Sequence, residues 1–131
     1  MTSAKAILIV DASPIMRRVI ERALRLAGIE WGQIVEAADG AEALALAQQR
    51  RFDLVLTDIN LPGMNGLELL RQLRQAAATS TMPVVIITSQ GGESHVLEAL
   101  SLGAQGYIRK PFTADQVKEY IAPLFSLPAM S

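Results

Sequence analysis

The chain has 131 residues, which is the size of one domain and enough to bury roughly two thirds of the surface that the unfolded chain exposes. Twelve basic and thirteen acidic residues give a net charge of −1, which excludes a broad electrostatic attraction to nucleic acid or to anionic membranes. Cysteine is absent, so disulfides, thiolate metal sites and catalysis by cysteine are excluded. No apolar run approaches the roughly 18 residues of a membrane span and no secretory signal opens the chain, so we expect a soluble, cytoplasmic protein.

The first strand and helix are predicted within residues 6–28. Residues 6–10 are apolar and partly β-branched, as in a strand, whereas apolar residues then recur at helical spacing until Gly28. Ser13 is the expected N-cap of this helix, and Pro14 suits its first turn, where a backbone N–H has no helical partner.

The alternation of strand and helix continues along the rest of the chain. The other predicted strands are residues 33–37, 52–58, 84–89 and 106–110, and the helices residues 41–51, 67–78, 95–103 and 114–125, the last capped by Thr113. Such alternation predicts an α/β fold: a doubly wound, five-stranded parallel sheet with helices on both faces. No linker interrupts it, so residues 1–131 are predicted to form a single domain.

Polar side chains stand where four of the predicted strands end. Asp11 follows the first strand, Asp58 ends the third, Thr88 and Ser89 end the fourth, and Lys110 ends the fifth. Sheets of this kind bind ligands beyond the carboxyl ends of their strands, so we expect these side chains to lie close together. Two acids, two hydroxyls and a lysine in one place indicate phosphoryl chemistry.

Each group has a predicted role in that chemistry. Asp58 is the candidate nucleophile toward phosphorus, which would form an aspartyl phosphate. Mg²⁺ prefers oxygen ligands and usually takes one or two carboxylates, so Asp11 and Asp58 are the candidate metal ligands, with the backbone carbonyl of Asn60 as a third. Lys110 would pair with one phosphoryl oxygen and the Thr88 hydroxyl would donate to another.

Four motifs carry a resemblance to a known family. VDASP, LTDINLPGMNG, IITS and GYIRKPF, in this order and spacing, resemble the receiver domain of two-component response regulators, the CheY-like class. The resemblance extends from about residue 5 to about residue 124 and implies the strand order 2-1-3-4-5.

The resemblance implies a role for each matching residue. Asp58 would accept the phosphoryl group, Asn60 and Gln90 would tune its hydrolysis, Thr88 and Tyr107 would act as switch residues, and Lys110 would be the conserved lysine, often followed by a cis peptide bond to proline. It implies Mg²⁺ as cofactor and a sensor histidine kinase or a histidine phosphotransfer protein as partner. Any activity would be limited to Mg²⁺-dependent self-phosphorylation from a phosphodonor and autodephosphorylation.

Ala12 departs from the pattern of this family. Most receivers carry two adjacent acids after the first strand; Asp11 matches the first of them, whereas the second, which commonly touches the metal directly, is replaced by Ala12. One of three site carboxylates is therefore missing, so we expect Mg²⁺ binding that is weakened but not abolished.

Two functions remain open at this point. The first is a stand-alone receiver, monomeric or weakly dimeric, that signals to a separate output protein because the chain stops at Ser131 without an effector domain. Its signalling face would comprise the fourth helix, fifth strand and fifth helix, including His95, Val96, Ala99, Gln116 and Tyr120. The second is a pseudo-receiver that binds partners without phosphorylation because of Ala12. A phosphohydrolase is disfavoured by Ser13, where such enzymes place a second acid, and flavin binding by the lack of a phosphate-cradling loop.

Some of these residues also have structural interpretations. Asp11 suits a turn or cap, and Tyr107 suits simple packing. The arginines of the first helix, which are Arg17, Arg18, Arg22 and Arg25, would form a basic face that is either solvated or used to dock a phosphodonor.

Overall fold

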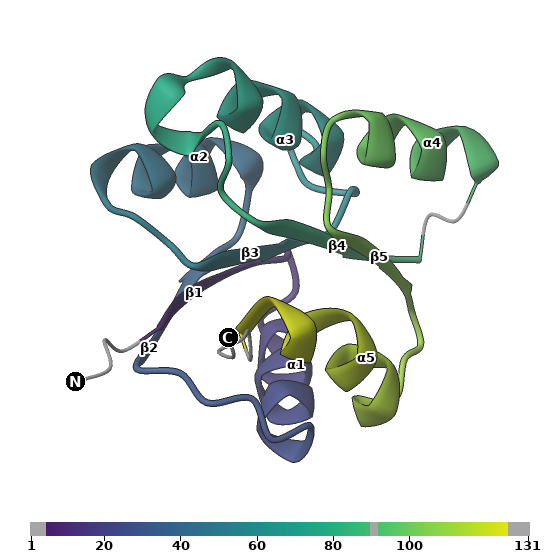
Figure 1. Ribbon diagram of the computed structural model, residues 1–131. Helices are drawn as coiled ribbons and strands as arrows, with labels where there is room; N and C mark the ends of the chain where they lie inside the picture. The colour runs from purple at the N-terminus through teal and green to yellow at the C-terminus, as the bar shows by residue number, and fades with distance from the viewer. Residues whose placement is uncertain (1–4, 90–91, 126–131) are drawn as a thin grey trace.

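The computed structural model describes residues 5–89 and 92–125. Its strands are β1 (Ala6–Val10), β2 (Gln33–Ala37), β3 (Leu54–Thr57), β4 (Val84–Thr88) and β5 (Gly106–Arg109). They form one parallel sheet in the order β2-β1-β3-β4-β5 (Figure 1). The predicted α/β fold and its implied strand order are confirmed.

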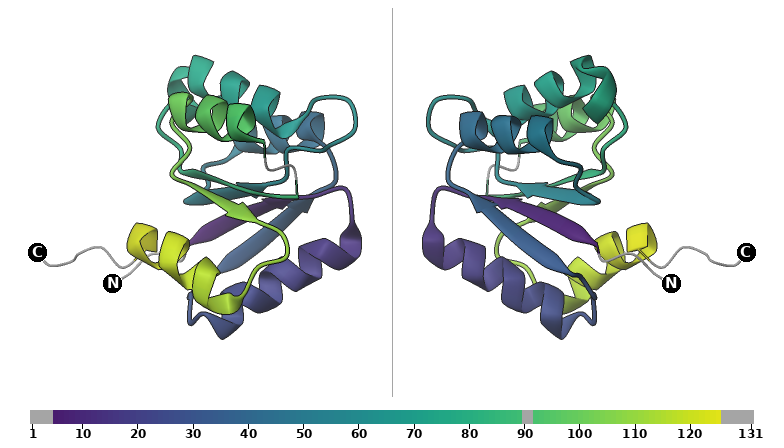
Figure 2. Two further views of the ribbon diagram at one scale, coloured as in Figure 1. Left: turned by 90° about the vertical axis from the view of Figure 1, so that its right-hand side faces the viewer. Right: turned by 90° about the vertical axis from the view of Figure 1, so that its left-hand side faces the viewer.

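Helices cover both faces of the sheet. They are α1 (Pro14–Leu26), α2 (Gly40–Gln49), α3 (Gly66–Gln75), α4 (Glu93–Ser101) and α5 (Ala114–Phe125). The views in Figures 1 and 2 place α1 and α5 on one face and α2, α3 and α4 on the other. Within the described ranges, none of the helices has the length and apolar character needed to cross a membrane.

Several element bounds differ from the prediction by one to three residues, and three of them have a clear outcome. The third strand is shorter than residues 52–58. The third helix ends at Gln75 because Ala76 is extended (φ −97°, ψ 136°), and a 3-10 turn, Ala77–Thr79, follows it. The fourth helix begins at Glu93, before the predicted start, because Gly92 takes the N-cap position and a glutamate is favoured by the helix dipole in the first turn.

The alternation of side chains along each strand builds two cores, one on each face of the sheet. In β1, Ile7 and Ile9 pack in the core under α1 and α5, whereas Leu8 and Val10 pack in the core under α2, α3 and α4. Each fully buried Leu or Ile side chain stabilises the fold by about 1.5–3 kcal/mol. The strands are therefore held firmly from both sides, and their carboxyl ends are well-fixed positions for functional groups.

Side-chain caps set where the helices begin. Ser13 Oγ accepts a hydrogen bond from the Met16 N–H (3.1 Å), so α1 starts at Pro14, three residues after Asp11. Thr113 and Gln116 cap α5 reciprocally, at 3.1 Å and 2.9 Å. Both predicted caps are confirmed, and each follows a loop that carries a site residue.

Candidate functional site

Two carboxylates and one ammonium group meet beyond the carboxyl ends of the strands. Asp11 and Asp58 directly follow the neighbouring strands β1 and β3, whose last residues, Val10 and Thr57, are paired in the sheet. Lys110 Nζ lies 2.8 Å from Asp11 Oδ2 and 3.2 Å from Asp58 Oδ2. The structure thus brings together three of the residues that were predicted to meet.

These three groups are largely withdrawn from water. Asp11 is 3% exposed, Asp58 is 8% exposed, and the side chain of Lys110 is mostly buried. Burial disfavours isolated charges, so buried carboxylates require cations or hydrogen-bond donors. One ammonium group for two carboxylates leaves a formal charge of about −1 at the site, which favours a further cation.

Lys110 reaches the carboxylates from the end of β5. Its backbone N–H donates to the Thr88 carbonyl at 3.0 Å, which ties the start of its loop to the end of β4. The peptide bond between Lys110 and Pro111 is cis, as the family resemblance implied.

The second oxygen of each carboxylate is held by the backbone of its own loop. Asp11 Oδ1 accepts from the Ser13 N–H at 2.9 Å, and Asp58 Oδ1 accepts from the Asn60 N–H at 3.3 Å. Asp11 is therefore a turn residue and a member of the charged cluster at once. In both acids it is Oδ2 that faces the shared cation.

Gly66 allows the start of α3 to approach the backbone of Asp58. A Cβ at position 66 would lie 2.1 Å from the Asp58 carbonyl oxygen, and the Gly66 N–H donates to the Ile59 carbonyl at 2.8 Å. Thr57 Oγ1 donates to the same Asp58 carbonyl at 2.9 Å. A glycine that opens a helix, where better helix formers are available, is the sequence signal of this close approach.

The two predicted switch residues lie on neighbouring strands. Thr88 is fully buried at the end of β4, and Tyr107 of β5 is half-buried against the core under α2, α3 and α4. Burial raises the pKa of Tyr107 above its ordinary value; the charge of Arg109 opposes this shift and that of Asp58 adds to it. Gln90 lies outside the described residues.

The donor atoms present fit a magnesium ion that takes only a few of its ligands from the protein and the rest from water. Asp11 Oδ2 and Asp58 Oδ2 already converge on one cation, the ammonium of Lys110, and carboxylate oxygens are preferred ligands of Mg²⁺. Among the described residues, no group of three or more His, Cys, Asp or Glu side chains could hold a metal. A metal here would therefore have two carboxylates, a backbone carbonyl such as that of Asn60, and water.

Comparison with known proteins assigns the family. Residues 7–122 match the family model of the response regulator receiver domain. The chain belongs to this family. The receiver is 40% identical over 119 residues to the chemotaxis protein CheY of Pseudomonas aeruginosa, covering 91% of the chain and 94% of that protein. It is 41% identical over 119 residues to the chemotaxis protein CheY-3 of Vibrio cholerae, covering 91% and 90%.

Solved structures are similar over nearly the whole receiver. A putative response regulator from Chloroflexus aurantiacus J-10-fl has a TM-score of 0.82 and 30% identity, covering 93% of this chain and 98% of that chain. The receiver domain of the sensor histidine kinase PA1611 from Pseudomonas aeruginosa has a TM-score of 0.75 and 27% identity, covering 89% and 93%. That structure contains a magnesium ion coordinated in the active site cleft.

Arg17 of the receiver contacts this region, and the sequence did not predict this contact. Its Nε lies 2.6 Å from Glu36 Oε1, and its Nη1 donates to the backbone carbonyl of Asp11 at 2.5 Å. The prediction that Arg17 belongs to the basic face of α1 is therefore wrong, because its guanidinium turns away from solvent toward the ends of β1 and β2.

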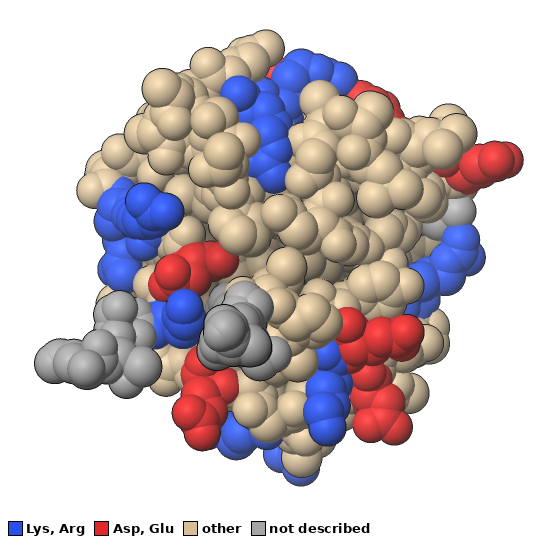
Figure 3. All heavy atoms as spheres, in the orientation of Figure 1, with Lys and Arg blue, Asp and Glu red and all other residues tan. Residues whose placement is uncertain are grey.

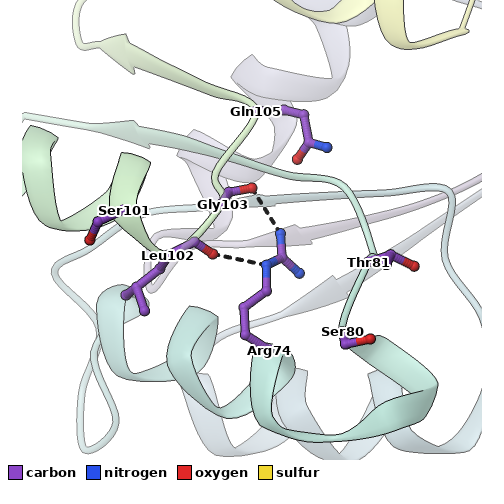
Figure 4. Close-up of a pocket in the computed structure, with 7 residues that line it drawn as sticks. All are labelled: Arg74, Ser80, Thr81, Ser101, Leu102, Gly103 and Gln105. Atoms are coloured by element: carbon purple, nitrogen blue, oxygen red, sulfur yellow. Dashed lines mark hydrogen bonds between the residues drawn. The ribbon is translucent and has the colours of Figure 1, made fainter.

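A separate cavity of about 510 Å³ lies at the opposite edge of the sheet, where the loops lead into β4 and β5 (Figure 4). Arg74 crosses it and donates from Nε to Leu102 O (2.9 Å), from Nη2 to Gly103 O (3.0 Å) and from Nη1 to Thr79 O (3.3 Å). Burial lowers the pKa of Arg74. The carbonyls at helix ends favour a cation, so this arginine acts as a cap for the end of α4.

Proposed function

We propose that the receiver accepts a phosphoryl group on Asp58 from a sensor histidine kinase or a histidine phosphotransfer protein. The observation that carries this proposal is the convergence of Asp11, Asp58 and Lys110 at the carboxyl edge of the sheet. The membership of the chain in the receiver family supports it.

In the proposed reaction, a carboxylate oxygen of Asp58 attacks the phosphorus of a phosphohistidine. The new O–P bond forms as the P–N bond breaks, and the departing imidazole nitrogen takes up a proton from solvent. Lys110 then pairs with a phosphoryl oxygen in place of its present contact with Asp58 Oδ2. Mg²⁺, if held by Asp11, Asp58 and the carbonyl of Asn60, would supply positive charge that offsets the negative charge of the phosphoryl oxygens. Attack of water on the same phosphorus returns the carboxylate and releases phosphate.

The proposed output is a change in the face formed by α4, β5 and α5. Phosphorylation adds negative charge at Asp58, which draws the Thr88 hydroxyl toward it and lets Tyr107 turn inward. On this face Leu97, Leu100 and Tyr120 are exposed, on the side of the molecule where Figure 1 shows α4 and α5 flanking β5.

One residue predicted for the signalling face does not belong to it. Ala99 is fully buried, because it is the residue of α4 that packs into the core, so a partner would contact its exposed neighbours on α4 instead.

The proposed docking surface for the phosphodonor is the exposed side of α1. Ile15, Val19 and Leu26 are exposed apolar residues there, with Arg22 and Arg25 between and beside them. The face in Figure 3 shows basic and acidic side chains interspersed. A helix with an apolar stripe and acidic residues has the complementary chemistry.

Intact mass measurement with acetyl phosphate tests the proposed function. We expect a Mg²⁺-dependent gain of one phosphoryl group that chelator prevents and that Asp58→Asn abolishes. Asp53→Asn is the matched control, because Asp53 Oδ2 accepts from the Ala6 N–H at the other edge of the sheet; it should be labelled like the parent.

The same experiment decides between the receiver and the pseudo-receiver. Ala12 is exposed beside Asp11 and contributes no carboxylate, which is the observation that favours the second function. If the parent stays unlabelled while Ala12→Asp is labelled, the missing carboxylate has silenced the site and phosphorylation is not the function.

A further inference from the structure

Arg17 differs from the other arginines of α1 in burial and in contacts. Its side chain is 14% exposed, against 68% for that of Arg25, and Arg18 is likewise exposed. Its guanidinium joins three elements, since Arg17 belongs to α1, Glu36 to β2, and Asp11 to the end of β1. In both bonds the donor is a charged guanidinium, and such charge-assisted hydrogen bonds are stronger than those between neutral groups.

The contact with Arg17 completes the hydrogen bonding of Asp11. The Asp11 N–H donates to the Ala37 carbonyl at 3.1 Å, its carbonyl accepts from Arg17, and its Oδ1 accepts from the Ser13 N–H at 2.9 Å. Three of the four polar groups of Asp11 are therefore used to fix the residue. The fourth, Oδ2, meets Lys110.

We propose that Arg17 is a positioning residue for the cation site. By joining the Asp11 carbonyl to Glu36 at the end of β2, it fixes the turn that aims Asp11 Oδ2 at Lys110 and at a divalent cation. This inference rests on the proposed Mg²⁺ site. It matters in this chain because Ala12 leaves two site carboxylates, so misplacing Asp11 would remove one of the two.

Two simpler roles for Arg17 make different predictions. An ion pair that only stabilises the fold would change the unfolding temperature without changing cation affinity. A bare positive charge near two acids would repel a metal, so neutralising Arg17 would tighten cation binding. A positioning role predicts weaker binding even when the charge is kept.

Arg17→Lys and Arg17→Gln separate these roles. A lysine keeps the charge, but its single ammonium does not reproduce the two-armed bridge between Glu36 and the Asp11 carbonyl. Binding of Mn²⁺, used as the probe for the Mg²⁺ site, is measured from the signal of the free ion in electron paramagnetic resonance. We expect both variants to bind Mn²⁺ roughly tenfold more weakly, the low end for groups that orient metal ligands. Arg18→Lys and Arg18→Gln, on the exposed side of the same helix, should match the parent.

Unchanged affinity in Arg17→Lys, or tighter binding in Arg17→Gln, would overturn the proposal. Should Arg17→Gln fail to fold, Glu36→Gln is the second variant, because it weakens one arm of the bridge and leaves the arginine in place. It should bind Mn²⁺ more weakly than the parent, and parent-like affinity would count against the positioning role.

A second readout needs no metal. The Ser13 amide proton is bonded to Asp11 Oδ1, so its chemical shift reports the placement of the carboxylate, and the Met16 amide, bonded to Ser13 Oγ, reports whether the helix cap is intact. We expect the Ser13 signal to move in both Arg17 variants while the Met16 signal stays. An unmoved Ser13 signal would refute the positioning role even if the parent binds no Mn²⁺, in which case the proposed metal site fails separately.

Discussion

A partly buried cation lies at each end of the parallel strands, and the oxygens around these two cations differ. At the carboxyl edge, Lys110 contacts two carboxylates. At the amino edge, Arg74 contacts three backbone carbonyls. Backbone carbonyls are neutral, so the arginine that they bind only stabilises the fold. Carboxylate oxygens are ligands that can exchange one cation for another, so the surroundings of Lys110 suit the proposed binding of a metal and a phosphoryl group. The chemistry of the acceptors, more than the presence of a partly buried cation, distinguishes the candidate functional site from the structural one.

Replacing Lys110 by Met should produce the largest change. Loss of the ammonium removes a donor to the transferred phosphoryl group, and loss of one such donor typically costs about a hundredfold in rate. Labelling by acetyl phosphate, followed over time by intact mass, measures this rate. Lys118→Met, on the exposed side of α5, is the control and should leave the rate unchanged. Equal labelling of the Lys110 variant and the parent would remove the distinction between the two edges.

Arg74→Met should have the opposite profile. It leaves three carbonyls without their charged donor, so we expect the free energy of unfolding to fall by about 2 kcal/mol, while labelling at Asp58 is maintained. Urea denaturation of the variant and of Arg71→Met, one turn earlier on α3 and more exposed, provides the measurement and its control. A stability equal to that of Arg71→Met would show that the carbonyl contacts contribute little.

Ala12→Asp sharpens the comparison by adding a third carboxylate at the carboxyl edge. A further negative charge close to Asp11 should tighten Mn²⁺ or Mg²⁺ binding about tenfold, since one close charge–charge contact at a partly exposed site is worth a few kcal/mol at most. Titration with Mn²⁺ measures the change, and Ala12→Asn controls for side-chain size. Equal affinities of the Asp and Asn variants would mean that position 12 does not reach the cation.

The smallest expected effect is the difference in thermal stability between Gly103→Ala and Gly28→Ala. Both glycines have positive φ (85° and 80°), so both variants incur a similar left-handed strain of about 1–2 kcal/mol. A Cβ at position 103 would additionally lie 3.1 Å from Arg74 Nε, whereas none of the described atoms lies within 4 Å of a Cβ at position 28. Thermal unfolding should therefore show a slightly larger loss for Gly103→Ala. This excess should disappear in an Arg74→Met background, and its persistence there would exclude Arg74 as the cause.

The sequence by itself determined the elements and the fold class. Apolar periodicity, the caps Ser13 and Thr113, and the break at Gly28 are local signals, because they act between residues a few positions apart. The same locality explains the errors at helix ends: Ala76 carries no breaking signal, yet α3 stops there and a 3-10 turn follows.

Only the tertiary structure decided which charges meet. Asp11 and Lys110 are 99 positions apart in the chain. Arg17 and Arg18 are residues of the same type and stand next to each other on one helix. Their different tasks follow from the side of α1 on which each lies, because one side faces the ends of β1 and β2 and the other faces water. Charge contacts depend on distances across the fold, which local sequence patterns do not encode.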